Sequence, residues 1–138
     1  MTQEGKMLLI KDLSSRLPYS VHVQHTSGFS GTLHNISMHH KYDKNDNVYD
    51  IICYTDFFGD GDNITIEHFK PYLFPLSSMT EKQKNEYHNN CNVGLSRWGN
   101  EVYNDCIESI DWLNKNHFDY RGLIEKGLAI DATGLNIY

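Results

Sequence analysis

The sequence has few of the features expected of a secreted or membrane protein. It holds only three cysteines in 138 residues, Cys53, Cys91 and Cys106, and no two of them form a Cys-x-x-Cys pair. No apolar stretch approaches the roughly 20 residues that a membrane helix needs, since the N-terminal apolar run covers only residues 7–10. We therefore expect a cytoplasmic protein with free thiols, without a secretory signal or membrane contact.

Basic residues are also scarce. Twelve lysines and arginines stand against 18 acidic residues, which gives a formal net charge of −6, and the basic residues are scattered. Nucleic-acid-binding proteins more often carry a basic excess, because phosphate contacts supply much of their affinity. The charge balance makes nucleic acid an unexpected partner and favours a protein partner with a basic surface. It leaves the oligomeric state open.

Motifs for covalent or nucleotide chemistry are missing. The sequence contains no Gly-x-Ser-x-Gly, and the glycines at 59 and 61 lack the spacing of a nucleotide-binding loop. We therefore expect no catalytic residues, no cofactor and no enzymatic activity.

Histidines and carboxylates in one polar stretch are the candidates for a metal site. His39 and His40 adjoin Asp43 and Asp46, and imidazole with carboxylate can bind zinc. The four residues lack the usual spacing of zinc ligands, so they are weak candidates and we expect no metal. A calcium loop is disfavoured as well, because Val48 stands where an EF-hand requires glycine.

The patterning predicts one α+β domain over residues 1–138, β-rich in 1–70 and helical in 71–138. Leucines four residues apart predict a helix over 6–17, which Pro18 ends. Alternation and β-branched residues predict an antiparallel meander that could curl into a small SH3-like barrel. Its four strands are expected at 20–26, 32–38, 48–56 and 63–69, with an exposed loop at 39–47.

The C-terminal half should be mainly helical. An extended connector at 72–74 is expected to lead to a capping box from Ser78 to Glu81 and a surface helix to about Asn90. Two further helices are expected at about 104–116 and 120–126, with a short strand near 128–130. In the first of them, Ile107, Ile110 and Leu113 form an apolar stripe, and neighbouring Trp112 should enter the core.

Two adjacent phenylalanines at a hairpin tip are the candidate interface. Phe57 and Phe58 follow the strongest predicted strand, and adjacent strand residues point to opposite faces. One ring should therefore be exposed among three acids, Asp56, Asp60 and Asp62. An apolar tip ringed by acids is typical of a binding surface. In the alternative interpretation both rings pack onto the helices.

Two stretches, KPYLFPLSSMT at 70–80 and SIDWLNKNHFDYRGLIEKGL at 109–128, carry a resemblance. They resemble a family of uncharacterised proteins from the genomes of gut anaerobes and from their phages or mobile elements. The similarity covers about half of the chain, mostly its C-terminal part. It implies a small accessory protein of a mobile element or its host, and no functional residues.

Together these features predict a non-enzymatic protein-binding accessory module of a phage or mobile element. Such a module could act against host defence, for example as an anti-CRISPR protein that inhibits a CRISPR nuclease. The alternative is a nucleic-acid-associated small barrel, in which folding would gather Lys6, Lys11 and Arg16. A third hypothesis is a metal-dependent enzyme that uses the histidine-rich hairpins.

The first prediction concerns metal. Purified protein should contain no stoichiometric zinc or calcium, and EDTA should leave its melting temperature unchanged, because a bound structural metal would add to the folding free energy. Elemental analysis and thermal unfolding check this. A fall of several degrees on chelation would show that residues 39–46 hold an ion.

Overall fold

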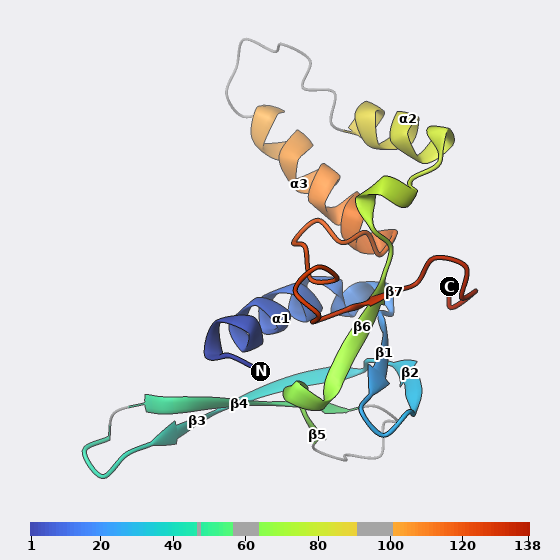
Figure 1. The fold of residues 1–138 in the computed structure, drawn as a ribbon. Coiled ribbons are helices and arrows are strands. Elements are labelled where there is room, and N and C mark those ends of the chain that lie inside the picture. Colours follow the sequence, from blue (N-terminus) through green and yellow to red (C-terminus); the bar gives the residue numbers. More distant parts are fainter. Residues whose placement is uncertain (47, 57–63, 91–100) are drawn as a thin grey trace.

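The protein's computed structural model describes residues 1–46, 48–56, 64–90 and 101–138 and has an α+β fold (Figure 1). Its strands form two hydrogen-bonded sheets, with orders β2-β1-β6-β7 and β3-β4-β5. The elements run along the chain as α1 (Gln3–Arg16), the 3-10 helix η1 (Leu17–Tyr19), β1 (His22–His25), β2 (Ser30–Thr32), β3 (Asn35–Tyr42), β4 (Val48–Asp56), β5 (Ile64–Thr65), η2 (Ile66–His68), β6 (Phe69–Leu73), η3 (Leu76–Ser78), α2 (Glu81–Asn90), α3 (Glu101–Lys115) and β7 (Ile130–Asp131).

Helix α1 forms where leucine spacing predicts a helix, and it supplies one wall of the core. Its first turn is capped by Thr2, whose Oγ1 accepts a hydrogen bond from the Gly5 N–H at 3.1 Å. Leu9 and Leu13 are fully buried. They join apolar residues from β1 and the positions beside β1 and β2, from η2 and β6, and from the C-terminal turns, namely Val21, Val23, Leu33, Ile66, Phe69, Leu73, Leu123 and Ala129.

The predicted four-stranded meander is split between the two sheets, so the SH3-like barrel is not confirmed. A β1–β2 hairpin forms, with Val23 opposite Gly31, but its second strand is Ser30–Thr32. The strand predicted at 32–38 is wrong as a partner of β1, because from Asn35 onward it belongs to β3 in the other sheet. The expected strand at 63–69 pairs with β4 only through β5 and then turns into η2. From Phe69 the chain crosses to the other sheet, where β6 pairs antiparallel with β1.

Strand β6 takes the place of the expected extended connector. It lies between β1 and β7, and β7 pairs with it in parallel through Tyr72 and Leu73. Proline within a strand argues against an inner position because it has no N–H to donate. The structure accommodates Pro71 because β7 contacts β6 only beyond that residue.

Strand β3 is longer than predicted, and the exposed loop expected at 39–47 is wrong for its first four residues. His39, His40 and Lys41 pair with Ile52, Ile51 and Asp50 of β4. A turn begins at Asp43, whose Oδ1 accepts a hydrogen bond from Asn45 N–H at 2.8 Å.

The helical half differs from expectation in its caps and its buried face. The capping box is Thr80 with Gln83, each of which bonds the other's backbone N–H. Ile107 and Ile110 are exposed, and Trp112 is half-buried, stacked on Phe118 with ring centroids 5.6 Å apart.

The helix expected at 120–126 is a series of turns. Asp119 lies before them, and its carboxylate accepts hydrogen bonds from the backbone N–H groups of Leu123 and Ile124, both at 2.8 Å. Gly122 adopts a left-handed φ of 68°, which interrupts a right-handed helix. The chain then runs into β7, close to the strand predicted near 128–130.

A buried ion pair ties α1 to the segment after α3. Asp12 and Arg16 are both fully buried, and Arg16 Nε donates to Asp12 Oδ2 at 2.7 Å. Arg16 Nη2 also donates to the Phe118 carbonyl at 2.7 Å, and its guanidinium lies 5.3 Å from the Tyr120 ring centre. Arg121 Nε approaches the same carboxylate at 3.4 Å.

Removing Arg16 should therefore destabilise the protein strongly. Arg16→Met strips the Asp12 carboxylate of its main partner, and breaking a buried pair from one side costs about 3–5 kcal/mol. The double change Asp12→Leu with Arg16→Met should recover part of that loss, since the buried carboxylate is removed together with its main partner. Recovery should be incomplete because Arg121 loses the Asp12 carboxylate and the Phe118 carbonyl loses its donor. Urea unfolding measures both.

The exposed pair of Lys82 and Glu86, 3.9 Å apart on α2, supplies the control. Glu86→Gln should change stability by less than about 0.5 kcal/mol. If Arg16→Met were as mild as Glu86→Gln, the buried pair would not hold the two segments together.

Candidate protein-binding surface

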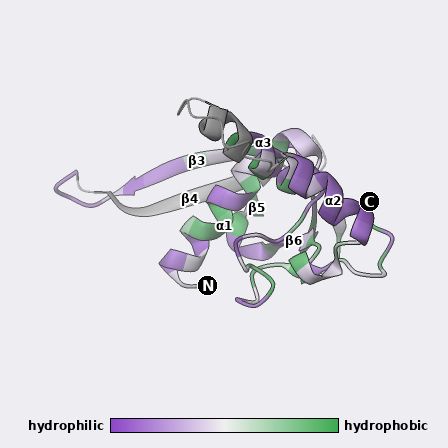
Figure 2. Cartoon of the chain, turned by 90° about the horizontal axis from the view of Figure 1, so that it is seen from above, coloured by the Kyte–Doolittle hydropathy of each residue, from purple (hydrophilic) through white to green (hydrophobic). Residues whose placement is uncertain are grey.

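The β3–β4 hairpin forms an arm that extends beyond the rest of the protein in both views (Figures 1 and 2). The two strands pair in an antiparallel register from Asn35 opposite Asp56 to Tyr42 opposite Val48. Strand β3 is an outer strand of its sheet, so one of its edges pairs with no described strand. An edge of this kind presents backbone N–H and C=O groups that can accept a further strand.

One face of β3 carries apolar and aromatic side chains. Met38, His40 and Tyr42 alternate along the strand and therefore share a face. Met38 is 47% exposed and Tyr42 is 58% exposed, while the His40 and Tyr42 rings lie 6.3 Å apart. We call these three residues the outer ridge.

Protection against strand addition is confined to the far end of β3. Natural edge strands are commonly guarded by lysine, proline or a bulge. Lys41 and the register shift between Lys41 and Tyr42 lie next to the turn. Residues 35–40, with the sequence NISMHH, contain no proline, glycine or lysine. This part of the edge has none of the usual sequence guards.

The weak metal candidates lie on this arm but are not arranged as a ligand set. His39 and His40 are consecutive residues of β3, so their side chains point to opposite faces. Asp43 and Asp46 form the turn, where Asp46 N–H donates to the Asp43 carbonyl at 3.2 Å. Within the described ranges, no three histidine, cysteine or acidic side chains gather as a metal site would require.

The candidate interface at the predicted hairpin tip has one described residue, Asp56. Phe57, Phe58, Asp60 and Asp62 lie outside the described residues. Asp56 is the last residue of β4 and pairs with Asn35, at the end of the arm away from the turn at Asp43. The sequence does not predict the outer ridge, because the polar composition around His40 and Tyr42 favours a loop. The alternation of Met38, His40 and Tyr42 was the available signal.

The basic cluster of the nucleic-acid hypothesis does not form. Arg16 is fully buried against Asp12, and Lys6 is 5% exposed with its Nζ 2.9 Å from Glu67 Oε1. Of the three residues only Lys11 is exposed. Buried, ion-paired cations cannot neutralise phosphates, so the grouping of Lys6, Lys11 and Arg16 was wrong.

His117 and Tyr138 stack on each other near Arg16, and both have pKa values shifted far from their usual ones. His117 is 7% exposed and stacks on Tyr138 with ring centroids 3.7 Å apart. Burial, aided by the Arg16 charge, lowers the pKa of His117 from 6.5 to about 4. Burial also raises the pKa of Tyr138 to about 12. The Tyr138 hydroxyl donates to the Tyr72 carbonyl at 2.8 Å.

Of these three residues, Arg16 and His117 belong to the core, whereas Tyr138 covers His117 from the surface and is itself 45% exposed. The Arg16 side chain is fully enclosed, and the His117 Nδ1 atom is buried without a hydrogen-bond partner. Neither group can reach a substrate in this conformation. Their perturbed environment therefore bears on stability.

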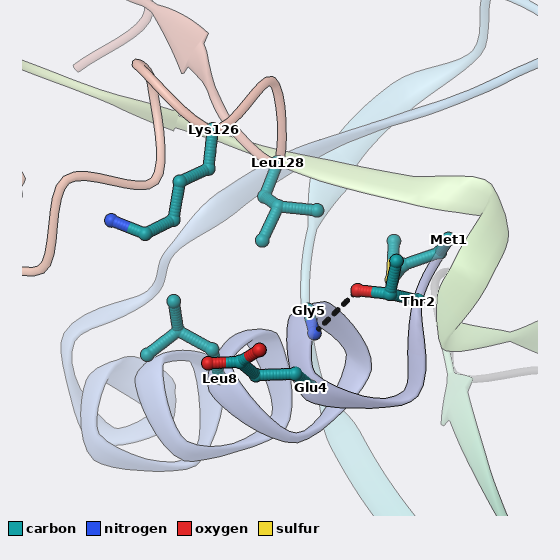
Figure 3. A pocket seen from close by; sticks show the side chains of 7 residues that line it. All are labelled: Met1, Thr2, Glu4, Gly5, Leu8, Lys126 and Leu128. Carbon is teal, nitrogen blue, oxygen red and sulfur yellow. Dashed lines mark hydrogen bonds between the residues drawn. The ribbon is translucent and has the colours of Figure 1, made fainter.

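A hollow of about 330 Å³ lies beside the start of α1 (Figure 3). Its apolar wall includes Leu8 and Leu128. Two of its polar groups are already engaged: Thr2 caps the helix, and Lys126 Nζ lies 3.3 Å from the carbonyls of Arg121 and Gly122. The hollow therefore offers few free polar groups for specific recognition.

Protonation of His117 should destabilise the fold in acid. Its folded pKa lies below its unfolded value, so the unfolded chain binds the proton more tightly. Stability should fall as the pH drops from about 6.5 to about 4, by up to about 3 kcal/mol, and this contribution should then level off. Urea unfolding across this pH range measures the slope.

His117→Asn should flatten that slope, because asparagine does not titrate and tolerates the left-handed φ of 58° at this position. The exposed His34 supplies the control, and His34→Asn should leave the slope unchanged. An unaltered slope in His117→Asn would mean that other groups govern the acid sensitivity.

Comparison with known proteins adds no relative. A scan against protein-family models gives no match, and neither do searches of curated proteins and of solved structures. Among the described residues, no helix is both long and apolar enough to cross a membrane.

Proposed function

We propose that this protein is a non-enzymatic binding module that captures a protein partner through its β3–β4 arm. The observation that carries the proposal is the edge of β3 that pairs with no described strand, on an arm that projects from the body (Figure 1) and carries the exposed outer ridge. The partner would add an extended segment to residues 35–40 of that edge.

Strand addition would use the backbone groups at the edge of β3 and the side chains of the outer ridge. The backbone of β3 would supply hydrogen bonds along the edge, as in other proteins that bind peptides by sheet extension. The outer ridge would supply specificity, because Met38 and Tyr42 could be covered by alternate side chains of the added segment. Fully burying a large apolar side chain contributes about 1.5–3 kcal/mol, so two such contacts are a substantial share of a binding free energy.

Net charge favours a partner with a basic surface. The chain carries a formal charge of −6, which would speed the approach of such a partner and make association sensitive to salt. The sequence resemblance described above supplies the setting: an accessory protein that acts in the cytoplasm for a phage or mobile element. Inhibition of a host defence system, such as a CRISPR nuclease, is the function of this kind that we propose.

The test removes the outer ridge without touching the core. Met38→Ser with Tyr42→Ser alters two exposed side chains and should leave the melting temperature nearly unchanged. Affinity capture from the native host, quantified by mass spectrometry, should recover a specific partner with the natural protein. The double variant should lose most of it.

A matched control removes equally exposed apolar groups elsewhere. Phe29 is 66% exposed and Leu135 is 49% exposed, and both lie outside the arm. Phe29→Ser with Leu135→Ser should retain the partner. Loss of the partner in this control, or its retention in the arm variant, would place the interface elsewhere and overturn the proposal.

A further inference from the structure

The hollow beside the start of α1 lies between two segments that are far apart in the sequence (Figure 3). Its volume of about 330 Å³ is at the lower end of the range of about 300–1,000 Å³ that is usual for small-ligand sites. It shares no residue with the β3 edge or the outer ridge, so it is independent of the proposed function. One wall is the start of α1 with the two residues before it, and the other is the C-terminal turns, through Met1, Thr2, Glu4, Gly5, Leu8, Lys126 and Leu128.

The interior of this hollow is mainly apolar. Leu8 and Leu128 are half-buried and pack against the core cluster. Their side chains project from the two walls into the space between them (Figure 3). A small aliphatic group in the hollow would therefore remove part of their surface from water, which favours binding.

Gly5 keeps the two walls apart without being required by the backbone. It is the third residue of α1, where glycine is a poorer helix former than alanine, and its φ is not among the positive ones. A Cβ atom at this position would lie 3.2 Å from Thr2 Oγ1, 3.5 Å from Met1 Cγ and 3.6 Å from Leu128 Cδ1. The missing side chain therefore leaves room inside the hollow.

Two side chains of opposite charge line the hollow and are not paired with each other. The Glu4 carboxylate has no ion pair or hydrogen bond within the described part of the chain. The Lys126 ammonium donates to the carbonyls of Arg121 and Gly122, both at 3.3 Å. An ammonium has three donors, so one N–H of Lys126 remains for a ligand. The lining thus offers one charged acceptor and one charged donor beside an apolar interior.

We propose that this hollow binds a free amino acid with an aliphatic side chain. The ammonium of the ligand would donate to Glu4, and its carboxylate would accept from Lys126. The aliphatic side chain would pack against Leu8 and Leu128. A ligand with only one charge would place that charge near a side chain of the same sign, whereas a zwitterion complements both.

Titration of the intact, isotopically labelled protein with L-leucine tests the proposal. Amide chemical shifts should change and saturate in the residues that line the hollow. Isoamylamine and N-acetyl-L-leucine each lack one of the two charges, and glycine lacks the aliphatic side chain. Each of these three probes should bind at least about tenfold more weakly than leucine, because each loses one of the three contacts. Absence of saturable shifts with leucine, or equal binding of any of these probes, would overturn the proposal.

Glu4→Gln should weaken leucine binding roughly tenfold, because it removes the charged acceptor for the ligand's ammonium. The same variant should bind leucine and N-acetyl-L-leucine with more nearly equal affinity. Glu125→Gln supplies the matched control, because Glu125 is exposed and adjoins Lys126 without lining the hollow. It should leave leucine affinity within about twofold, since only longer-range charge changes there. Equal weakening by both variants would show general electrostatic attraction and contradict a specific site.

Discussion

The buried pair of Asp12 and Arg16 connects the two halves of this protein. Arg16 lies at the end of α1 and reaches the Phe118 carbonyl, 102 residues further along the chain. That contact fixes the segment after α3, where the Phe74 N–H donates to the His117 carbonyl at 2.9 Å. The Trp112, Phe118 and Tyr87 rings then join α3 to α2. The packing of the helical half against the sheet therefore depends on an ion pair shielded from water.

The sequence predicts the parts of this fold that depend on local pattern. Helix α1 and strands β1 and β4 follow from leucine spacing, alternation and β-branched residues, and all three lie close to their expected positions. The errors arise where distant segments decide the outcome. Pro71 by itself argues against an inner strand, but β7 pairs with β6 only beyond that residue. Arg16 by itself is typical of a surface cation, but the fold buries it against Asp12.

The candidate site could be predicted only in part. A binding surface on a β-hairpin was expected, but at Phe57 and Phe58, which lie outside the described residues. On the arm, Met38, His40 and Tyr42 are exposed and share one face of β3. Composition alone did not reveal them, because histidine and lysine in a polar stretch are also typical of a loop. The length of β3 depends on its pairing with β4, which is a non-local property.

The claim that β3 offers an open edge can be measured directly by amide hydrogen exchange. In an edge strand, alternate N–H groups point away from the sheet, so residues 35–40 should exchange in an alternating fast and slow pattern in the free protein. Addition of the captured partner should slow the fast set selectively. Uniform protection of these amides in the free, dilute protein would show that the edge is already covered, and that result would contradict the account.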